Sequence, residues 1–548
     1  MKKTIVSLFL LCGMWSAGAQ NGNGSTQKPR LIVNIVVSQM RYDYLDRFYD
    51  NFTDNGFKLF IDRGVNFRSA RYGYMQTNTV AGLATISTGT NPSIHGVVSE
   101  NWIDYTTSRK INIIEDYDVR GLETDYGIGT YSPYNLSAAT IGDRLREGDD
   151  RSKAISIASD PVSAIVSGGP SAQAFWMDIG RGNWISSSYY FDALPFWVQD
   201  YNKSKFPAAF VNRDWTLTYS PSGYRNTEMT VLRPQGDTKP FLKNFFSNVV
   251  KIFKGDDEKH DYASIHYTPF GNMVVGSFAR EAVMREGLGR DEHTDLLTVC
   301  FDSPRLIAER FGPRSTEVED MYYKLDFEIG ELVGFINAQF DNGEVMFVLT
   351  SDHGSSDTYQ EGSKIPTGLF NAQQFKMIMN GFLSAQYEPG EWVLDYIDRQ
   401  LYLNRDMIYT YGLVLSEVQT RASAFVLQFR GVANAMTSTA MQNSYFGQGV
   451  GEKIQNGFYP KRSGDITINL MPGWIEDDDG KVSLPGSLYE YDVHVPLMFY
   501  SPRLAPAKIN RDVDMTSVAP TLARIMHLTP PNASTGEILT EITSAYEN

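Results

Sequence analysis

The sequence predicts an α/β fold, in which a doubly wound and mostly parallel sheet carries helices on both faces. Three short apolar runs have the composition of strands buried on both faces: Leu31–Val37, Leu296–Phe301 and Val345–Thr350. Between the last two lies Ser315–Phe340, where apolar residues recur at helical spacing. Alternating strands and helices are typical of a doubly wound sheet. Such sheets bind ligands at the carboxyl ends of their strands, so functional side chains are expected directly after these runs.

The first 19 residues have the layout of a cleaved secretory signal peptide. Lys2 and Lys3 precede an apolar run, and small residues follow up to Ala19. The alternative is an uncleaved membrane anchor, but the apolar run is shorter than the roughly 20 residues that a bilayer-spanning helix needs. We therefore expect export, to the periplasm rather than to the extracellular medium, and a flexible polar leader over residues 20–29.

Residues 30–548 are expected to form one domain that carries two insertions. Residues from about 168 to 259 are rich in tryptophan and turn residues, and those from about 366 to 485 form a second long break in the alternation. Both are predicted to be cap segments on the core, whose aromatic side chains mainly pack within the cap. No apolar run after the signal peptide is long enough for a transmembrane segment.

The charge of the chain bears on its partners. The formal net charge is -15, and the basic residues are not clustered. An acidic chain of this kind is a poor ligand for nucleic acid or for an anionic membrane surface. The expected partner is therefore an unidentified protein or a small phosphorylated ligand.

Three positions could carry chemistry, and each has an ordinary structural alternative. Asp352 and His353 leave the third apolar run together at a Ser-Asp-His-Gly turn, where they could ligate a metal or simply form a turn. The hydroxyl of Thr79 could attack an ester phosphorus at a metal or could cap a helix. His494 lies beside another apolar run, as a ligand or as an ordinary residue at the start of a strand.

Together these segments resemble the phosphate-irrepressible bacterial alkaline phosphatases, in the type I phosphodiesterase branch of the alkaline-phosphatase superfamily. The further segments that carry the resemblance are Gln39–Leu45, Ala174–Asp178, Thr268–Asn272, Phe311–Pro313, Lys364–Pro366 and Asp492–Pro496. The resemblance implies an alkaline-phosphatase-like fold and a two-zinc site with a threonine nucleophile that forms a phosphoryl-enzyme intermediate. It matches Thr79 to the nucleophile, Asp352 and His353 to ligands of one zinc, and His494 to a ligand of the other.

Many residues of the two-zinc site that the resemblance implies are replaced in this sequence. The altered positions are Ser38 for an aspartate ligand, Arg305 and Glu309 for an aspartate and a histidine ligand, Glu100 for a phosphoryl-contacting asparagine, and Ser159 and Pro161 for a phosphoryl-gripping lysine and arginine. Half of the expected zinc ligands therefore remain.

These replacements predict a pseudophosphatase that binds or assembles in the cell envelope. Arg305 cannot ligate a metal, and it lies one helical turn from Glu309, where the two can form an ion pair in place of a zinc. Glu309 is also a candidate substitute ligand, so at most one zinc ion is expected. The alternative is an active phosphomonoesterase or phosphodiesterase with a remodelled one-metal site and Thr79 as its nucleophile.

Overall fold

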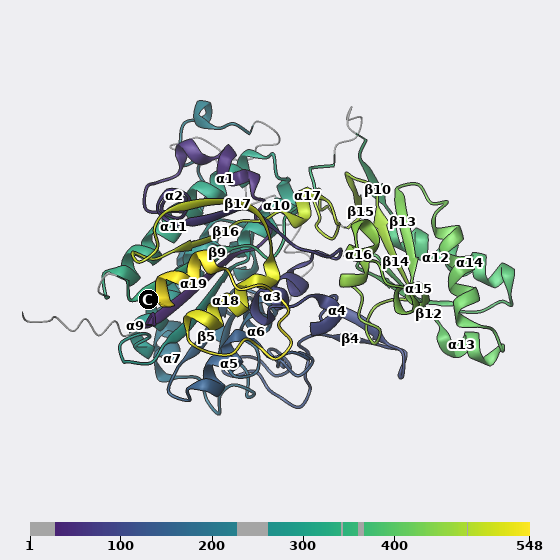
Figure 1. The fold of residues 1–548 in the computed structure, drawn as a ribbon, viewed down its shortest axis with the longest axis horizontal. Coiled ribbons are helices and arrows are strands. Elements are labelled where there is room, and N and C mark those ends of the chain that lie inside the picture. Colours follow the sequence, from purple (N-terminus) through teal and green to yellow (C-terminus); the bar gives the residue numbers. More distant parts are fainter. Residues whose placement is uncertain (1–27, 227–260, 341–342, 360–365, 479, 548) are drawn as a thin grey trace, which may run out of the picture.

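A computed structural model describes residues 28–226, 261–340, 343–359, 366–478 and 480–547 (Figure 1). The predicted signal peptide over residues 1–19 lies outside the described residues. So do most of the predicted leader and residues 227–259 of the first predicted insertion.

A mixed sheet of nine strands forms the centre of the molecule, in the order β17-β2-β16-β9-β1-β8-β5-β6-β7. Its middle strand is β1 (Leu31–Val37), which pairs in parallel with β8 (Asp295–Phe301) and with β9 (Val345–Thr350). The remaining strands are β5 (Ala154–Ala158), β6 (Gln173–Asp178), β7 (Asn183–Ile185), β2 (Val65–Arg71), β16 (Leu497–Tyr500) and β17 (Ala507–Asp514). The three predicted strands are confirmed, and all their residues are buried, as continuous apolar runs require.

Helices cover both faces of this sheet, which confirms the predicted fold class. Successive residues of β1 point to opposite faces, so Val33 and Ile35 join one apolar cluster while Ile32 and Val36 join another. The first cluster includes α2 (Phe57–Arg63), α9 (Phe270–Glu286) and α11 (Thr316–Asn337), and the second includes α3 (Thr79–Thr88), α5 (Ile141–Gly148), α6 (Pro161–Gly168), α18 (Val518–Ile525) and α19 (Thr540–Glu547). Within the described ranges, no helix is both long and apolar enough to cross a membrane.

The two predicted insertions are built differently. The first begins with β6 and β7, which extend the main sheet instead of decorating it. Its Trp176 and Trp184 are buried in these strands, so tryptophan there belongs to the core. The tryptophan and turn residues of this stretch favoured the prediction of an irregular cap segment. The short, mostly apolar strand Gln173–Asp178 was not recognised in it.

The second predicted insertion forms a separate lobe, drawn in green in Figure 1. Its antiparallel sheet contains β11 (Val393–Ile397), β12 (Gln400–Leu403), β14 (Ile466–Leu470) and β13 (Val432–Thr437), in that order. The helices α12 (Ala372–Gln386), α13 (Arg405–Thr410), α14 (Leu415–Val426), α15 (Ser438–Asn443) and α16 (Gly449–Asn456), and the short strands β10 (Gly368–Phe370) and β15 (Trp474–Glu476), complete it. Phe375, Met379 and Leu383 lie in an apolar cluster of the lobe's own.

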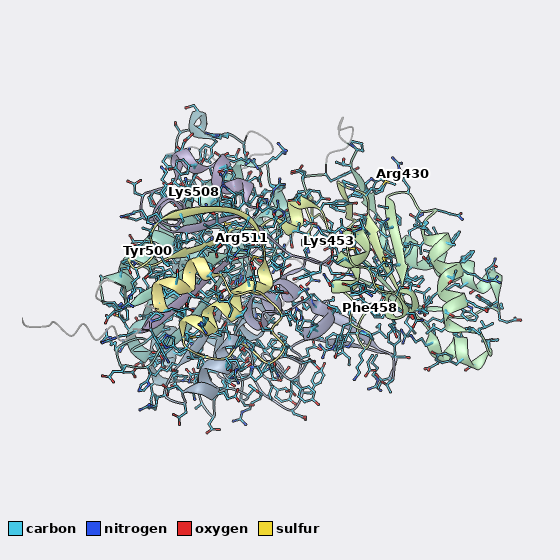
Figure 2. All side chains as sticks on the ribbon, viewed as in Figure 1. Arg430, Lys453, Phe458, Tyr500, Lys508 and Arg511 are labelled. Carbon is cyan, nitrogen blue, oxygen red and sulfur yellow. The ribbon has the colours of Figure 1, made fainter. Side chains whose placement is uncertain are left out.

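The lobe packs against the core through a small apolar contact. Met75 of the core clusters with Met441, Ile454 and Phe458 of the lobe. The backbone N–H of Met75 donates to the carbonyl of Lys453, 2.9 Å away. Figure 2 labels Lys453 and Phe458 at this junction, and Arg430 farther out on the lobe. The lobe is therefore held where it can face the carboxyl ends of the main strands.

Candidate functional site

Polar residues gather where the parallel strands end, as the fold predicts. Ser38 follows β1 and Asp352 follows β9, and the Ser38 hydroxyl donates to Asp352 Oδ2 at 2.6 Å. Ser159 follows β5 and Asp302 follows β8, and the Ser159 hydroxyl donates to Asp302 Oδ2 at 2.9 Å. The polar side chains that follow neighbouring strands therefore meet in pairs.

Asp352 has both of its carboxylate oxygens engaged by protein donors. The backbone N–H groups of Gln39 and His353 donate to Oδ1 at 2.8 and 2.9 Å. Oδ2 accepts the hydroxyl proton of Ser38. The whole residue is buried. Ser38 therefore supplies a neutral donor where the resemblance implies a second carboxylate, and Asp352 is satisfied as a hydrogen-bond acceptor.

Thr79 lies against His353 and does not cap its helix. Asn78 is the N-cap of α3, and its side chain accepts from the backbone N–H of Ala81. The Thr79 hydroxyl is thus left 3.1 Å from Nε2 of His353. Nδ1 of His353 donates to the carbonyl of Gly354 at 2.7 Å, so in the neutral ring Nε2 accepts the threonine proton.

A glycine permits this approach of α3 to the turn over residues 351–354. A Cβ at Gly82 would lie 1.9 Å from the carbonyl oxygen of Asp352. Any larger residue would push the helix, and Thr79 with it, away from His353. The sequence therefore positions the hydroxyl and the imidazole together through a residue that carries no chemistry of its own.

On the other side of the site, a guanidinium stands between two carboxylates. Arg305 of α10 (Ser303–Phe311) lies 3.2 Å from Asp160 and 3.5 Å from Glu309, and Lys481 of the lobe lies 3.3 Å from Glu309. Burial opposes the charge on Arg305, but Glu309 and Asp160 outweigh it and raise its pKa above the ordinary value. The predicted pairing of Arg305 with Glu309 is present.

The positions expected to grip a phosphoryl group are used to start a helix. Asp160 is the N-cap of α6 and accepts from the backbone N–H of Val162, and Pro161 is the first helical residue and has no N–H to donate. Ser159 is turned to Asp302 by its backbone N–H and its hydroxyl. Burial, and then Asp160, raise the pKa of Glu100. None of these four side chains offers a cation to a phosphate.

His494 is not brought to this group of residues. Its Nε2 bonds the carbonyl of Arg68 at 2.8 Å, and its ring stacks on Tyr42 with centroids 4.5 Å apart. His494 follows the short helix α17 (Glu490–Val493) as its C-terminal cap and is extended. His494 thus lies at the edge of β2, bridged to Arg71, and its expected role as a ligand of the second zinc stays a prediction.

A cavity of about 200 Å³ lies between the core and the lobe. Thr79, Glu100, Arg305 and Glu309 line it from the core. The lobe and the segment that follows it contribute Asp398, Arg399, Glu476, Asp478, Lys481 and Pro485. We did not predict these residues of the lobe as site residues. The sequence feature that could have indicated them is the charged pair Asp398–Arg399, which lies between the strand-like runs Val393–Ile397 and Gln400–Leu403.

The donor set does not fit a two-zinc centre. No cluster of three or more His, Cys, Asp or Glu side chains suited to a metal ion occurs in the part of the chain that the structure describes. Arg305 fills the place between Glu309 and Asp160 with a positive charge of its own. Asp352 and His353 provide two conventional ligands, one fewer than catalytic zinc sites take from the protein.

Comparisons with known proteins agree with this architecture. The family model for type I phosphodiesterase / nucleotide pyrophosphatase matches residues 32–483. The alkaline phosphatase PhoV of Synechococcus elongatus is 31% identical over 569 residues, covering 99% of both chains. The alkaline phosphatase PafA of Elizabethkingia meningoseptica is 29% identical, again covering 99% of both.

A crystal structure of PafA superposes on this chain with a TM-score of 0.86 at 28% identity, covering 94% of this chain and 99% of PafA. The similarity thus extends over the core and the lobe, including the segments that frame the cavity. The chain belongs to the type I phosphodiesterase / nucleotide pyrophosphatase family, and within the alkaline-phosphatase superfamily it is a PafA-like protein.

Proposed function

We propose that this chain is a pseudophosphatase, which uses the phosphatase fold for binding and not for hydrolysis. The observation that carries the proposal is Arg305, which pairs with Glu309 and Asp160 at 3.5 and 3.2 Å. A protonated guanidinium has no lone pair for a metal. It supplies to Glu309 and Asp160 the positive charge that a bound cation would otherwise supply.

The other half of the site supports the same proposal. Ser38 removes one carboxylate, and its hydroxyl donates to Asp352. The loss of the lysine and arginine clamp leaves Ser159 and Pro161 without a cation for a phosphoryl group. A phosphate monoester would meet an excess of carboxylates in this cavity and would be repelled.

We also propose that the protein acts in the bacterial cell envelope, most simply in the periplasm. The basis is the signal-like layout of residues 1–19. Its partner there is a protein or a small charged ligand, and nucleic acid is disfavoured by the net charge of -15. Fractionation of native cells, followed by N-terminal sequencing of the mature chain, tests the location.

The enzymatic question is settled by metal analysis and turnover on the same sample. The mature chain is dialysed against zinc, its bound metals are counted, and aryl phosphate and aryl phosphodiester are assayed across pH. We expect no zinc-dependent turnover. Zinc-dependent turnover that Thr79→Ala abolishes would refute the proposal, because that variant removes the matched nucleophile and keeps the fold.

One observation favours a second candidate, a hydrolase with a single metal ion. Thr79 Oγ1 and Asp352 Oδ2 lie 3.1 and 3.6 Å from Nε2 of His353, which is about the spacing of neighbouring ligands around one zinc. Such an ion would lower the pKa of the threonine hydroxyl and make it a better nucleophile. The lone pair of His353 Nε2 would hold the ion in that case and would not also accept the threonine proton.

The two candidates predict different responses to Asp352→Asn. A one-metal hydrolase loses its carboxylate ligand, so metal binding and turnover fall together. A pseudophosphatase keeps acceptors for Gln39 and His353, and the Ser38 hydroxyl can turn to accept from the new amide. Its ligand binding is then unchanged.

A further inference from the structure

Arg399 is a buried cation without a counterion in contact. The residue is 3% exposed, and among the residues that the structure describes it forms no ion pair. Nη2 donates to the carbonyl of Pro485 at 3.2 Å, and Nη1 has no hydrogen-bond partner. Glu476 and Asp398 attract the guanidinium, but neither forms an ion pair with it. Because Arg399 lines the cavity, an anionic group of a ligand would supply the missing partner.

The backbone that delivers Arg399 is itself strained. Asp398 and Arg399 form the two-residue turn between β11 and β12, with φ of 44° and 63°. Both values lie in the left-handed region, where such turns usually have asparagine or glycine. The hydroxyl of Ser99 in the core donates to Asp398, which fixes the tip of the hairpin against the cavity. Strain of this kind concentrates at functional sites.

The same cavity holds carboxylates without a cation in contact. Glu476 Oε1 has no hydrogen-bond partner, and Glu100 is bonded by Asn112 at 3.3 Å and forms no ion pair within the described residues. By contrast, Arg305 and Lys481 are already paired with acids. Burial raises the pKa of both glutamates, and the opposing effects of Arg399 on Glu476 and of Arg305 on Glu100 do not offset it.

The balance of charge argues against a simple anion as the ligand. Three cationic and five acidic side chains line the cavity: Arg305, Arg399, Lys481, Glu100, Glu309, Asp398, Glu476 and Asp478. The acids are therefore in excess, and a dianion bound by Arg399 alone would be repelled by them. A ligand that also carries a positive charge would give hydrogen-bond partners to both Arg399 Nη1 and Glu476 Oε1.

We propose that this cavity binds a small zwitterion, with its carboxylate or phosphate group on Arg399 and its ammonium group toward Glu476 and Glu100. About 200 Å³ accommodates a molecule of amino-acid size. The assignment rests on the proposed function, because it takes the cavity as a binding site and not as a site of hydrolysis.

The test compares matched probes by isothermal titration calorimetry on the whole mature chain. The probes are 3-aminopropyl phosphate against propyl phosphate, and 4-aminobutyrate against butyrate. We expect each zwitterion to bind at least about tenfold more tightly than its anion, since charged hydrogen bonds contribute about 1.5–3 kcal/mol. The stronger of the two zwitterions identifies phosphate or carboxylate as the recognised group.

Variants of the hairpin locate the binding. Arg399→Gln should weaken binding of the zwitterion by at least about tenfold. Arg399→Lys should weaken it less, because the positive charge remains while the planar, forked arrangement of guanidinium donors is lost. Arg399→Gln should still unfold as a folded chain without ligand, at a lower melting temperature, because Asp398 and Glu476 lose a nearby cation. Arg421→Gln is the matched control: this arginine is exposed on α14 of the same lobe, and binding should not change.

Three outcomes overturn the inference: equal affinity for zwitterion and anion, binding by no probe, or full binding by a folded Arg399→Gln variant. Phosphorus NMR of the bound 3-aminopropyl phosphate separates this failure from that of the proposed function. Release of inorganic phosphate would refute the pseudophosphatase and leave the recognition intact. An unchanged phosphorus signal without binding would refute the zwitterion alone.

Discussion

The two sides of the candidate site have changed in opposite ways. Thr79, Asp352 and His353 keep residue types that a metal site can use. Asp352 accepts hydrogen bonds from Ser38 and from the backbone of His353, and Thr79 bonds the His353 ring. Around Arg305 and Glu309, a cation of the protein has entered and formed ion pairs. On the proposed function, the first side lacks a ligand that the resemblance implies, whereas the second carries a cation of the protein in place of the ion. The second change is the harder one to reverse, because the guanidinium occupies the space and supplies the charge.

The largest effect is expected from Arg305→Ala, which removes the substitute cation. Glu309 and Asp160 would lose a partner, and Glu309 is buried. Breaking a buried pair in this way should lower the free energy of unfolding by about 4 kcal/mol. Urea unfolding of the variant and of the unmodified chain at pH 7 measures this difference in the free energy of unfolding. Arg305→Met combined with Glu309→Gln should recover much of the loss; an equally unstable double variant would show that the guanidinium acts through packing and not through charge.

The next effect concerns Ser38→Asp, which restores a carboxylate on the other side. Two buried carboxylates would then meet at the 2.6 Å contact of Ser38 with Asp352, so the variant should lose about 3 kcal/mol in EDTA. Zinc should restore about 2.7 kcal/mol at a hundredfold excess over its Kd. Thermal unfolding with and without zinc measures both. Ser38→Ala is the control, and a zinc response there would mean that the added carboxylate is not a ligand.

A smaller effect is expected from pH, through Asp302. Burial, and then Asp160, raise the pKa of Asp302 to about 6. The folded chain therefore holds a proton that the unfolded chain has released above about pH 4. Stability should fall as pH rises from about 4 to about 6, by up to about 1.4 kcal/mol per pH unit, and level off above.

Asp302→Asn should flatten this pH dependence. Its amide oxygen can accept from Ser159 and Asp160, and its NH₂ can donate to Ser163. Unfolding curves at several pH values, compared with the unmodified chain, measure the difference. An unchanged slope in the variant would assign the dependence to another carboxyl group.

The smallest effect is expected from His494→Phe. The ring keeps its stacking on Tyr42 and loses one bond to the carbonyl of Arg68. Stability should change by about 1 kcal/mol or less, and metal content should not change. A loss of bound zinc in this variant would return His494 to the site and contradict its place at the edge of β2.

The main sheet was predictable because its central strands are buried on both faces and read as continuous apolar runs. The residues after those strands were predictable for the same reason, and the Arg305–Glu309 pair followed from helical spacing. The contacts of His494 with Tyr42 and Arg68 were not predictable, because both partners lie far from it in the sequence. Arg399 and Glu476 were missed because a distant lobe brings them to the cavity, and no local pattern reports that contact.

The central claim, that a guanidinium has replaced a metal ion, is tested most directly by crystals grown with zinc. An anomalous difference map at the zinc absorption edge would locate any bound ion, and the ordinary density would show Arg305. We expect no zinc peak between Glu309 and Asp160, and the guanidinium in contact with both. A zinc peak at that position, with Arg305 turned away from Glu309, would contradict the claim.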